Sequence, residues 1–120
     1  MPSPPHILSV GKDRHLMWSR SMILRTAGYS VDEAYTVEAA IKLVDQDSID
    51  AMLICHTVPG REQNLLISTV RSQRRLMPIL CIKAYVFETT PKTSIAVEND
   101  PDALLNALRQ ALNRPEKSTM

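Results

Sequence analysis

Apolar and polar residues follow two different periods along this chain, and the switches between them mark the predicted elements. The segment 51–54 is apolar at every position, and Pro59-Gly60 ends the run shortly afterwards. A short apolar run bounded by turn residues is typical of a central strand buried on both faces. Similar runs predict four more strands, over 6–10, 29–35, 79–82 and 94–97. The strand over 29–35 is more polar, as expected near the edge of a sheet.

Between these strands the apolar residues recur every three to four positions, which predicts helices. Each of three predicted helices begins at a residue that can cap it: Asp13, Thr36 and Asp100, the last followed by proline. The helices are expected over 13–27, 36–46, 61–73 and from Asp100 through Leu112. The residues predicted to face the core are Leu16, Ile23, Leu24 and Ala27 in the first helix, and Leu65, Leu66 and Val70 in the third.

The regular alternation of strand and helix predicts an α/β fold, with a parallel sheet covered on both faces. The favoured arrangement is a flavodoxin-like three-layer sandwich with strand order 2-1-3-4-5. We expect one domain over 6–114, with flexible termini at 1–5 and 115–120. Residues 85–94 carry no clean period, so we predict a loop there with at most one helical turn.

Composition narrows the class of protein. A net charge of +1, with 44% hydrophobic and 22% charged residues, is ordinary for a soluble globular protein and gives no reason to expect nucleic acid or membrane as the main partner. No apolar run approaches the roughly 20 residues of a membrane span, and the start does not resemble a signal peptide. Cys55 and Cys81 lack metal-type spacing, and neither His6 nor His15 has a metal-ligand companion. We therefore predict a cytoplasmic protein with free thiols.

Several segments together resemble the response-regulator receiver domain. The resemblance rests on the runs Ile7-Leu8-Ser9-Val10, Ala27-Gly28-Tyr29-Ser30-Val31, Asp50-Ala51-Met52-Leu53-Ile54, Val58-Pro59-Gly60, Pro78-Ile79-Leu80-Cys81-Ile82-Lys83-Ala84 and Asp100-Pro101-Asp102-Ala103-Leu104. It covers almost the whole chain and implies the same strand order.

The phosphorylation-site positions of that family carry other residues here. The family's Mg²⁺-binding acidic pair after the first strand is matched by Gly11-Lys12, and its phosphoacceptor aspartate by Cys55. Its hydroxyl residue after the fourth strand is matched by Lys83, and its lysine after the fifth by Val97 or Glu98. Mg²⁺ needs oxygen ligands and an aspartyl phosphate needs a carboxylate. The resemblance thus implies a degenerate receiver, or pseudo-receiver, with no catalytic residues, metal or cofactor.

A further departure lies between Lys83 and Glu98, where no amphipathic helix is evident. The family's fourth helix is therefore predicted to be short or missing.

Two alternatives to a silent site stay open. Cys55 could be a reactive thiol, with its pKa lowered by Lys12 and Lys83, or these lysines could bind an anion. Against this, Cys55 could be a small buried hydrophobe, and each lysine could pair with Asp13 or Glu98 or reach solvent. His56 is expected on the opposite face from Cys55, which argues against a Cys–His pair. A third hypothesis is an active receiver that uses Asp13 or Asp50.

The outer side of the first helix is the candidate partner-binding surface. Trp18 and Met22 fall there one turn apart, flanked by Arg14 and Arg25. These residue types are enriched at the centres of protein interfaces. The basic cluster Arg71, Arg74 and Arg75 is explained by the end of the third helix. We predict a non-enzymatic protein-interaction module of bacterial two-component-type signalling, independent of phosphorylation, that binds a histidine kinase, a phosphotransfer protein, another signalling protein or a second copy of itself.

Overall fold

Strands and helices alternate in the computed structural model of this chain, which describes residues 4–46, 48–83 and 94–113. The described elements, in chain order, are β1 (His6–Val10), α1 (Arg14–Thr26), β2 (Ser30–Ala34), α2 (Val37–Gln46), β3 (Ala51–Ile54), α3 (Gly60–Gln73), β4 (Ile79–Ile82), β5 (Ile95–Val97) and α4 (Pro101–Leu112). Each predicted strand and helix is present, with bounds shifted by a residue or two.

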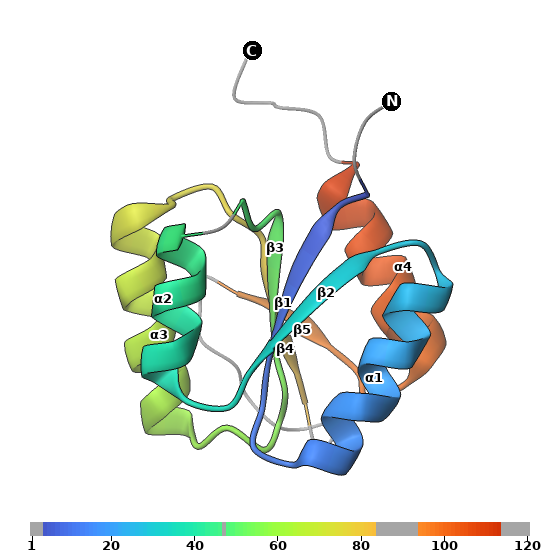
Figure 1. Cartoon of the computed structure of the whole chain (residues 1–120), viewed down its shortest axis with the longest axis horizontal. Helices are drawn as coiled ribbons and strands as arrows, with labels where there is room; N and C mark the ends of the chain where they lie inside the picture. Colours follow the sequence, from blue (N-terminus) through green and yellow to red (C-terminus); the bar gives the residue numbers. More distant parts are fainter. Residues whose placement is uncertain (1–3, 47, 84–93, 114–120) are drawn as a thin grey trace.

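The five strands form one parallel sheet in the order β2-β1-β3-β4-β5. Helices α2 and α3 cover one face of this sheet, and α1 and α4 cover the other (Figure 1). The predicted α/β flavodoxin-like sandwich is confirmed.

Alternate residues of each strand supply two separate cores, because neighbouring strand side chains point to opposite faces. Leu8, Met52 and Ile79 pack under α2 and α3, whereas Ile7, Leu53 and Leu80 pack under α1 and α4. β3 is buried at all four positions, as its uniform apolar sequence predicts.

The predicted helix starts are confirmed by their hydrogen bonds. The Asp13 carboxylate accepts from the backbone N–H groups of His15 and Leu16, and the Thr36 hydroxyl accepts from that of Ala39. Asp100 accepts from the N–H of Ala103, with Pro101 in the first helical turn. These side chains satisfy backbone donors that a helix start leaves unpaired.

The predicted inward face of α1 is correct for Leu24, which is fully buried, and wrong for the other three residues. The buried residues of α1 are Met17, Arg20, Ser21 and Leu24. Leu16 and Ile23 are only half-buried, and Ala27 is exposed. The pattern misled because two polar residues, Arg20 and Ser21, occupy core-facing positions between Met17 and Leu24. The same kind of error affects Leu65, which was assigned to the core of α3 but is 55% exposed.

Two predictions concern parts of the chain outside the described residues. The short or missing fourth helix of the family would fall within residues 84–93, and the flexible termini would include 1–3 and 114–120. Among the described residues, no helix has the length and apolar content to span a membrane.

Candidate functional site

Four residues lie together at the carboxyl ends of the strands, as the predicted strand order requires: Gly11, Cys55, Lys83 and Glu98. The N–H of Cys55 donates to the carbonyl of Val10 at 2.8 Å, which places Cys55 beside Gly11. The N–H of Lys83 donates to the carbonyl of Val97 at 2.8 Å, which places Lys83 beside Glu98. Because β3 and β4 are paired directly, all of these positions lie along one edge of the sheet.

Sulfur atoms occupy the space between Gly11 and Cys55. The Sδ of Met17 lies 3.7 Å from the Sγ of Cys55 and 3.7 Å from the Oγ of Ser9. A Cβ atom at Gly11 would lie 2.6 Å from that Sδ and 3.2 Å from the Sγ of Cys55. Met17 and Cys55 are each 1% exposed, so this space is filled by packed side chains.

The side chain of Lys12 reaches α3. Its Nζ lies 2.9 Å from an Oε atom of Glu62, and its backbone N–H donates to the hydroxyl of Thr57 at 2.9 Å. The ion pair is with neither of the partners considered from the sequence, Asp13 and Glu98. Lys12 therefore joins the β1–α1 connection to the start of α3.

The surroundings of Cys55 are those of a core residue. Burial raises the pKa of the Cys55 thiol, and the charge and hydrogen bonding of Arg20 and Ser9 oppose this rise. The sequence had suggested the opposite direction from nearby lysines. Burial raises the pKa of Cys55 by more than the positive charge of Arg20 lowers it. Cys81 is buried on the other face of the sheet, at 1% exposure.

The two aspartates considered as replacement phosphoacceptors have other roles. Both hydrogen bonds described for Asp13 cap the start of α1. Asp50 precedes β3, at the opposite edge of the sheet, where its carboxylate accepts from the backbone N–H of His6 at 2.7 Å. The Nε2 of His6 lies 2.8 Å from a carboxylate oxygen of Asp32.

Sequence reasoning missed Arg20, which is only 6% exposed although it carries a charge. Its Nη2 donates to the Oδ1 of Asn99 at 2.8 Å, a contact between residues 79 positions apart. Arg20 lies between Met17 and Leu24 on one face of the helix, and this spacing was the signal in the sequence that it faces the core. Arginine is rarely buried, so this spacing alone did not mark Arg20 as a core residue.

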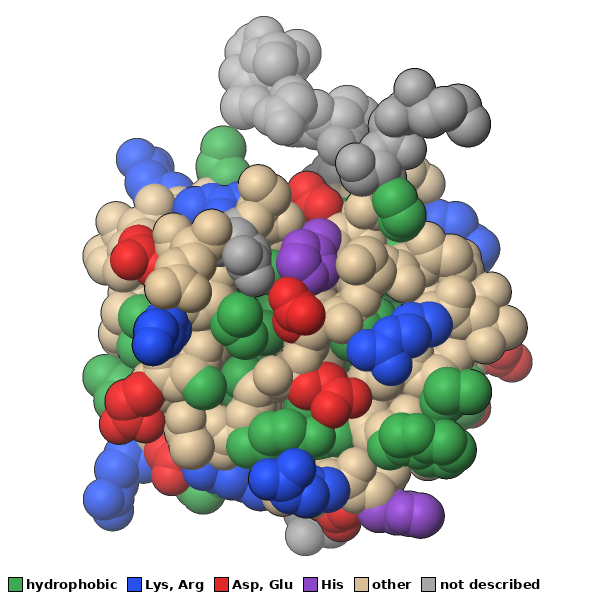
Figure 2. All heavy atoms as spheres, viewed as in Figure 1, with side chains coloured by type: hydrophobic (Ala, Val, Ile, Leu, Met, Phe, Trp, Pro, Cys, Tyr) green, Lys and Arg blue, Asp and Glu red, His purple; other side chains and the backbone are tan. Residues whose placement is uncertain are grey.

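The outer face of α1 carries the exposed apolar residues that the sequence placed there. Trp18 is 60% exposed and Met22 is 46% exposed. Figure 2 shows hydrophobic side chains gathered over α1 at the lower right. Arg14 lies over the ring of Tyr35, 4.5 Å from its centroid, and Arg25 donates to the carbonyl of Val31. Both arginines thus connect α1 to the β2 region.

A hydrogen bond between Ser21 of α1 and Glu33 of β2 also connects these two elements. The Ser21 hydroxyl donates to Glu33, and the Tyr35 hydroxyl donates to the other carboxylate oxygen at 2.7 Å. The Ser21 hydrogen bond lowers the pKa of Glu33, against the effect of burial. The hydrogen bond to Glu33 raises the pKa of Tyr35. These contacts hold α1 in place on its β2 side.

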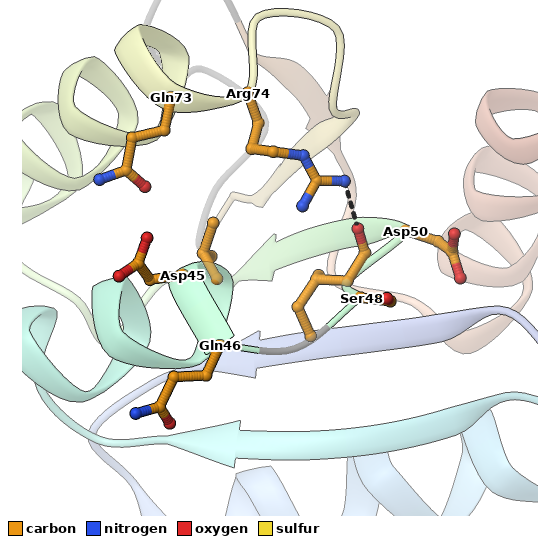
Figure 3. Close-up of a pocket in the computed structure, with 8 residues that line it drawn as sticks. Asp45, Gln46, Ser48, Asp50, Gln73 and Arg74 are labelled. Atoms are coloured by element: carbon orange, nitrogen blue, oxygen red, sulfur yellow. Dashed lines mark hydrogen bonds between the residues drawn. The ribbon is translucent and has the colours of Figure 1, made fainter.

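A polar pocket of about 470 Å³ lies at the other edge of the sheet, where β3 begins. Figure 3 shows Asp45 and Gln73 on opposite walls, with Asp50 turned away. Arg74 donates to the carbonyl of Ile49 at 2.8 Å, and Arg71 donates to the carbonyl of Met77. Arg71 therefore stabilises the loop after α3, and Arg74 joins that loop to the residues just before β3.

The residues at the carboxyl edge do not fit a Mg²⁺ ion. Its ligands would have to be oxygens, chiefly carboxylates, whereas Gly11, Lys12 and Cys55 offer none from their side chains. Within the three described segments, no group of three or more histidine, cysteine, aspartate or glutamate side chains could hold a metal ion.

Comparisons with known proteins place the fold. No protein-family model and no curated protein sequence matches this chain. Solved structures do match. One is a response regulator receiver domain protein (CheY-like) from Methanospirillum hungatei JF-1, with TM-score 0.82 and 20% identity over 97% of this chain and 99% of that one. Another is chemotaxis protein CheY4 of Vibrio cholerae, with TM-score 0.79 and 22% identity over 92% and 100%.

A third similar structure is response regulator protein TrrA from Thermotoga maritima, solved in complex with Mg²⁺ and BeF. It has TM-score 0.77 and 18% identity, over 90% of this chain and 99% of that one. This chain therefore has the receiver-domain fold of two-component response regulators.

Proposed function

We propose that this chain is a receiver-fold module of two-component-type signal transduction that acts without aspartyl phosphorylation, by binding another protein. The observation that carries the proposal is the packing of Gly11, Met17 and Cys55. These three residues fill the space at the carboxyl ends of β1 and β3 with carbon and sulfur atoms. The module is proposed to have no enzymatic activity of its own.

The chemistry of phosphoryl transfer explains why this packing matters. The nucleophile of an aspartyl phosphate is a carboxylate, and the phosphoryl oxygens need a divalent cation to offset their charge. Cys55 supplies no carboxylate. A carboxylate at position 11 would need space that Met17 occupies, since even a Cβ would lie 2.6 Å from the Met17 Sδ. Lys12 adds a positive charge on the same connection.

We expect no localised response when the amide NMR spectrum is titrated with Mg²⁺ and then with beryllofluoride. The signals to follow are those of residues 11–13 and Cys55, which flank the carboxyl edge. Thermotoga maritima TrrA, whose structure contains Mg²⁺ and BeF, is the positive control under the same conditions. Saturable shifts confined to residues 11–13 and Cys55 would contradict the proposal.

The outer face of α1 is the proposed contact surface for the partner. It presents Trp18 and Met22, and large exposed apolar residues on a rigid helix are typical anchors of protein interfaces. The contacts of Arg14, Arg25 and Ser21 with the β2 region hold the helix, so that this face is presented in one orientation. The partner is proposed to be a signalling protein or a second copy of this chain.

A photoreactive amino acid placed at Met22 should form a discrete covalent adduct in the native cell, because this position lies beside the proposed anchor. The matched control is the same amino acid at Leu65, which is similarly exposed but lies on α3. We expect the Met22 adduct to disappear with Trp18→Ala, as read by mass spectrometry of the adduct. An adduct at Leu65 alone, or one at Met22 that is insensitive to Trp18→Ala, would count against this surface.

The alternative, a thiol or anion sensor built on Cys55, Lys12 and Lys83, has less support. Lys12 is paired with Glu62, and burial raises the pKa of Cys55. Both observations weigh against a reactive thiolate.

A further inference from the structure

The guanidinium of Arg20 lies inside the protein with its hydrogen bonds only partly satisfied. Its Nη2 donates to the amide oxygen of Asn99 at 2.8 Å. Its Nη1 is buried without a hydrogen-bond acceptor. No ion pair joins Arg20 to a carboxylate in the described part of the chain. Asn99 is a neutral amide, and its side chain offers the buried guanidinium a single oxygen.

Such an arrangement holds α1 to the β5–α4 connection less firmly than it could. A buried polar group without a partner costs free energy, and a half-satisfied network offers less stability than a complete one. Natural proteins leave few such groups, so each calls for an explanation. The contact of Arg20 with Asn99 joins α1 to the β5–α4 connection, between residues 79 positions apart.

The contact also lies beside Cys55. Arg20 and Ser9 affect the Cys55 thiol by hydrogen bonding, and Met17, one turn before Arg20, covers the same sulfur. Releasing Arg20 from Asn99 would loosen the part of α1 that covers Cys55. We propose that the Arg20–Asn99 contact is a latch, whose opening exposes Cys55 and the carboxyl edge of the sheet without unfolding the rest of the domain. This inference goes beyond the proposed function and does not depend on it.

The two cysteines of the chain are natural reporters of this opening. Cys55 lies in the core under α1 and α4, and Cys81 lies in the core under α2 and α3. Both are 1% exposed, so a thiol reagent reaches either of them only when the structure opens. Pulse labelling with N-ethylmaleimide, followed by mass spectrometry of the peptides, measures both rates in the same molecule.

Under this proposal Cys55 is labelled faster than Cys81, and its rate depends less on urea, because local opening exposes little surface. Asn99→Ala should speed the labelling of Cys55 by about ten-fold, the effect of losing one hydrogen bond to a charged group. Asn106→Ala is the matched control, because Asn106 accepts from Arg109 on the exposed side of α4. This control should leave the Cys55 rate unchanged.

Asn99→Asp should have the opposite effect, since a carboxylate offers two oxygens to the guanidinium. We expect it to slow the labelling of Cys55 at least several-fold. The added charge also lies near the start of α4, which favours anions independently of Arg20. In an Arg20→Met background only this helix effect remains, so Asn99→Asp should slow the labelling of Cys55 far less than it does in the wild type.

Val44→Ala distinguishes local from global opening. Val44 lies on the buried face of α2, on the other side of the sheet from α1. Its truncation should destabilise the whole domain and speed the labelling of Cys81. The Cys55 rate should hardly change, because its opening is local. If Val44→Ala accelerates both cysteines equally, or if Asn99→Ala leaves the Cys55 rate unchanged, the latch is wrong. The beryllofluoride titration tests the proposed function separately.

Discussion

Leu66→Ala is expected to lower the free energy of unfolding by about 3 to 5 kcal/mol, whereas Leu65→Ala should change it by less than about 0.5 kcal/mol. The two leucines are neighbours on α3, but Leu66 is fully buried and Leu65 is 55% exposed. Truncating Leu66 leaves a cavity between α3 and the sheet. Truncating Leu65 removes only atoms that water already contacts.

Urea unfolding followed by circular dichroism measures both values, and each variant serves as the control for the other. Helix propensity contributes little to the comparison, because both substitutions replace leucine by alanine within the same helix. Similar losses of unfolding free energy at the two positions would mean that α3 does not direct Leu66 to the sheet and Leu65 to solvent. The result bears directly on which face of α3 contacts the sheet.

Gly11→Ala is expected to cost about 1 to 3 kcal/mol, the usual range for overpacking a core. The added Cβ would lie 2.6 Å from the Sδ of Met17 and 3.1 Å from the Cβ of Cys55, so a neighbour must move. Met17 is 1% exposed and its sulfur contacts both Ser9 and Cys55, which limits its freedom to move. Thermal or urea unfolding of the variant measures the loss.

A double-mutant cycle identifies the cause of that loss. In a Met17→Ala background the space beside Gly11 is enlarged, so Gly11→Ala should then cost much less than in the wild type. Gly60→Ala is the control for the general effect of replacing glycine, because a Cβ at Gly60 meets no atom within 4 Å. An unchanged cost of Gly11→Ala in the Met17→Ala background would show that Met17 is not the obstacle.

This cycle also bears on the proposed function. If Met17 closes the space beside Gly11, an acidic residue at position 11 is excluded by packing as well as absent from the sequence. Restoring phosphorylation chemistry would then require repacking α1 together with substitutions at positions 11, 12 and 55. A receiver fold with such a core is suited to a role that depends on its surface.

The sequence by itself determined the elements and their order. The uniform apolar run 51–54 identified the central strand, and Asp13, Thr36 and Asp100 identified three helix starts. These signals are local, because a strand buried on both faces needs apolar residues throughout and a helix start needs a nearby acceptor. The residues at the carboxyl edge could also be named, since parallel strands align their carboxyl ends at one edge.

Only the tertiary structure decided how side chains face one another across these elements. Arg20 is buried because Asn99, 79 positions away, supplies an acceptor, and no local pattern contains that information. The ion pair of Lys12 with Glu62 and the contact of Met17 with Cys55 also join segments far apart in the sequence. No local pattern predicts them either. The burial of Cys55 sets the direction of its pKa shift, and this burial follows from the packing of α1. The buried face of α1 was not evident from the sequence, because it includes the polar residues Arg20 and Ser21.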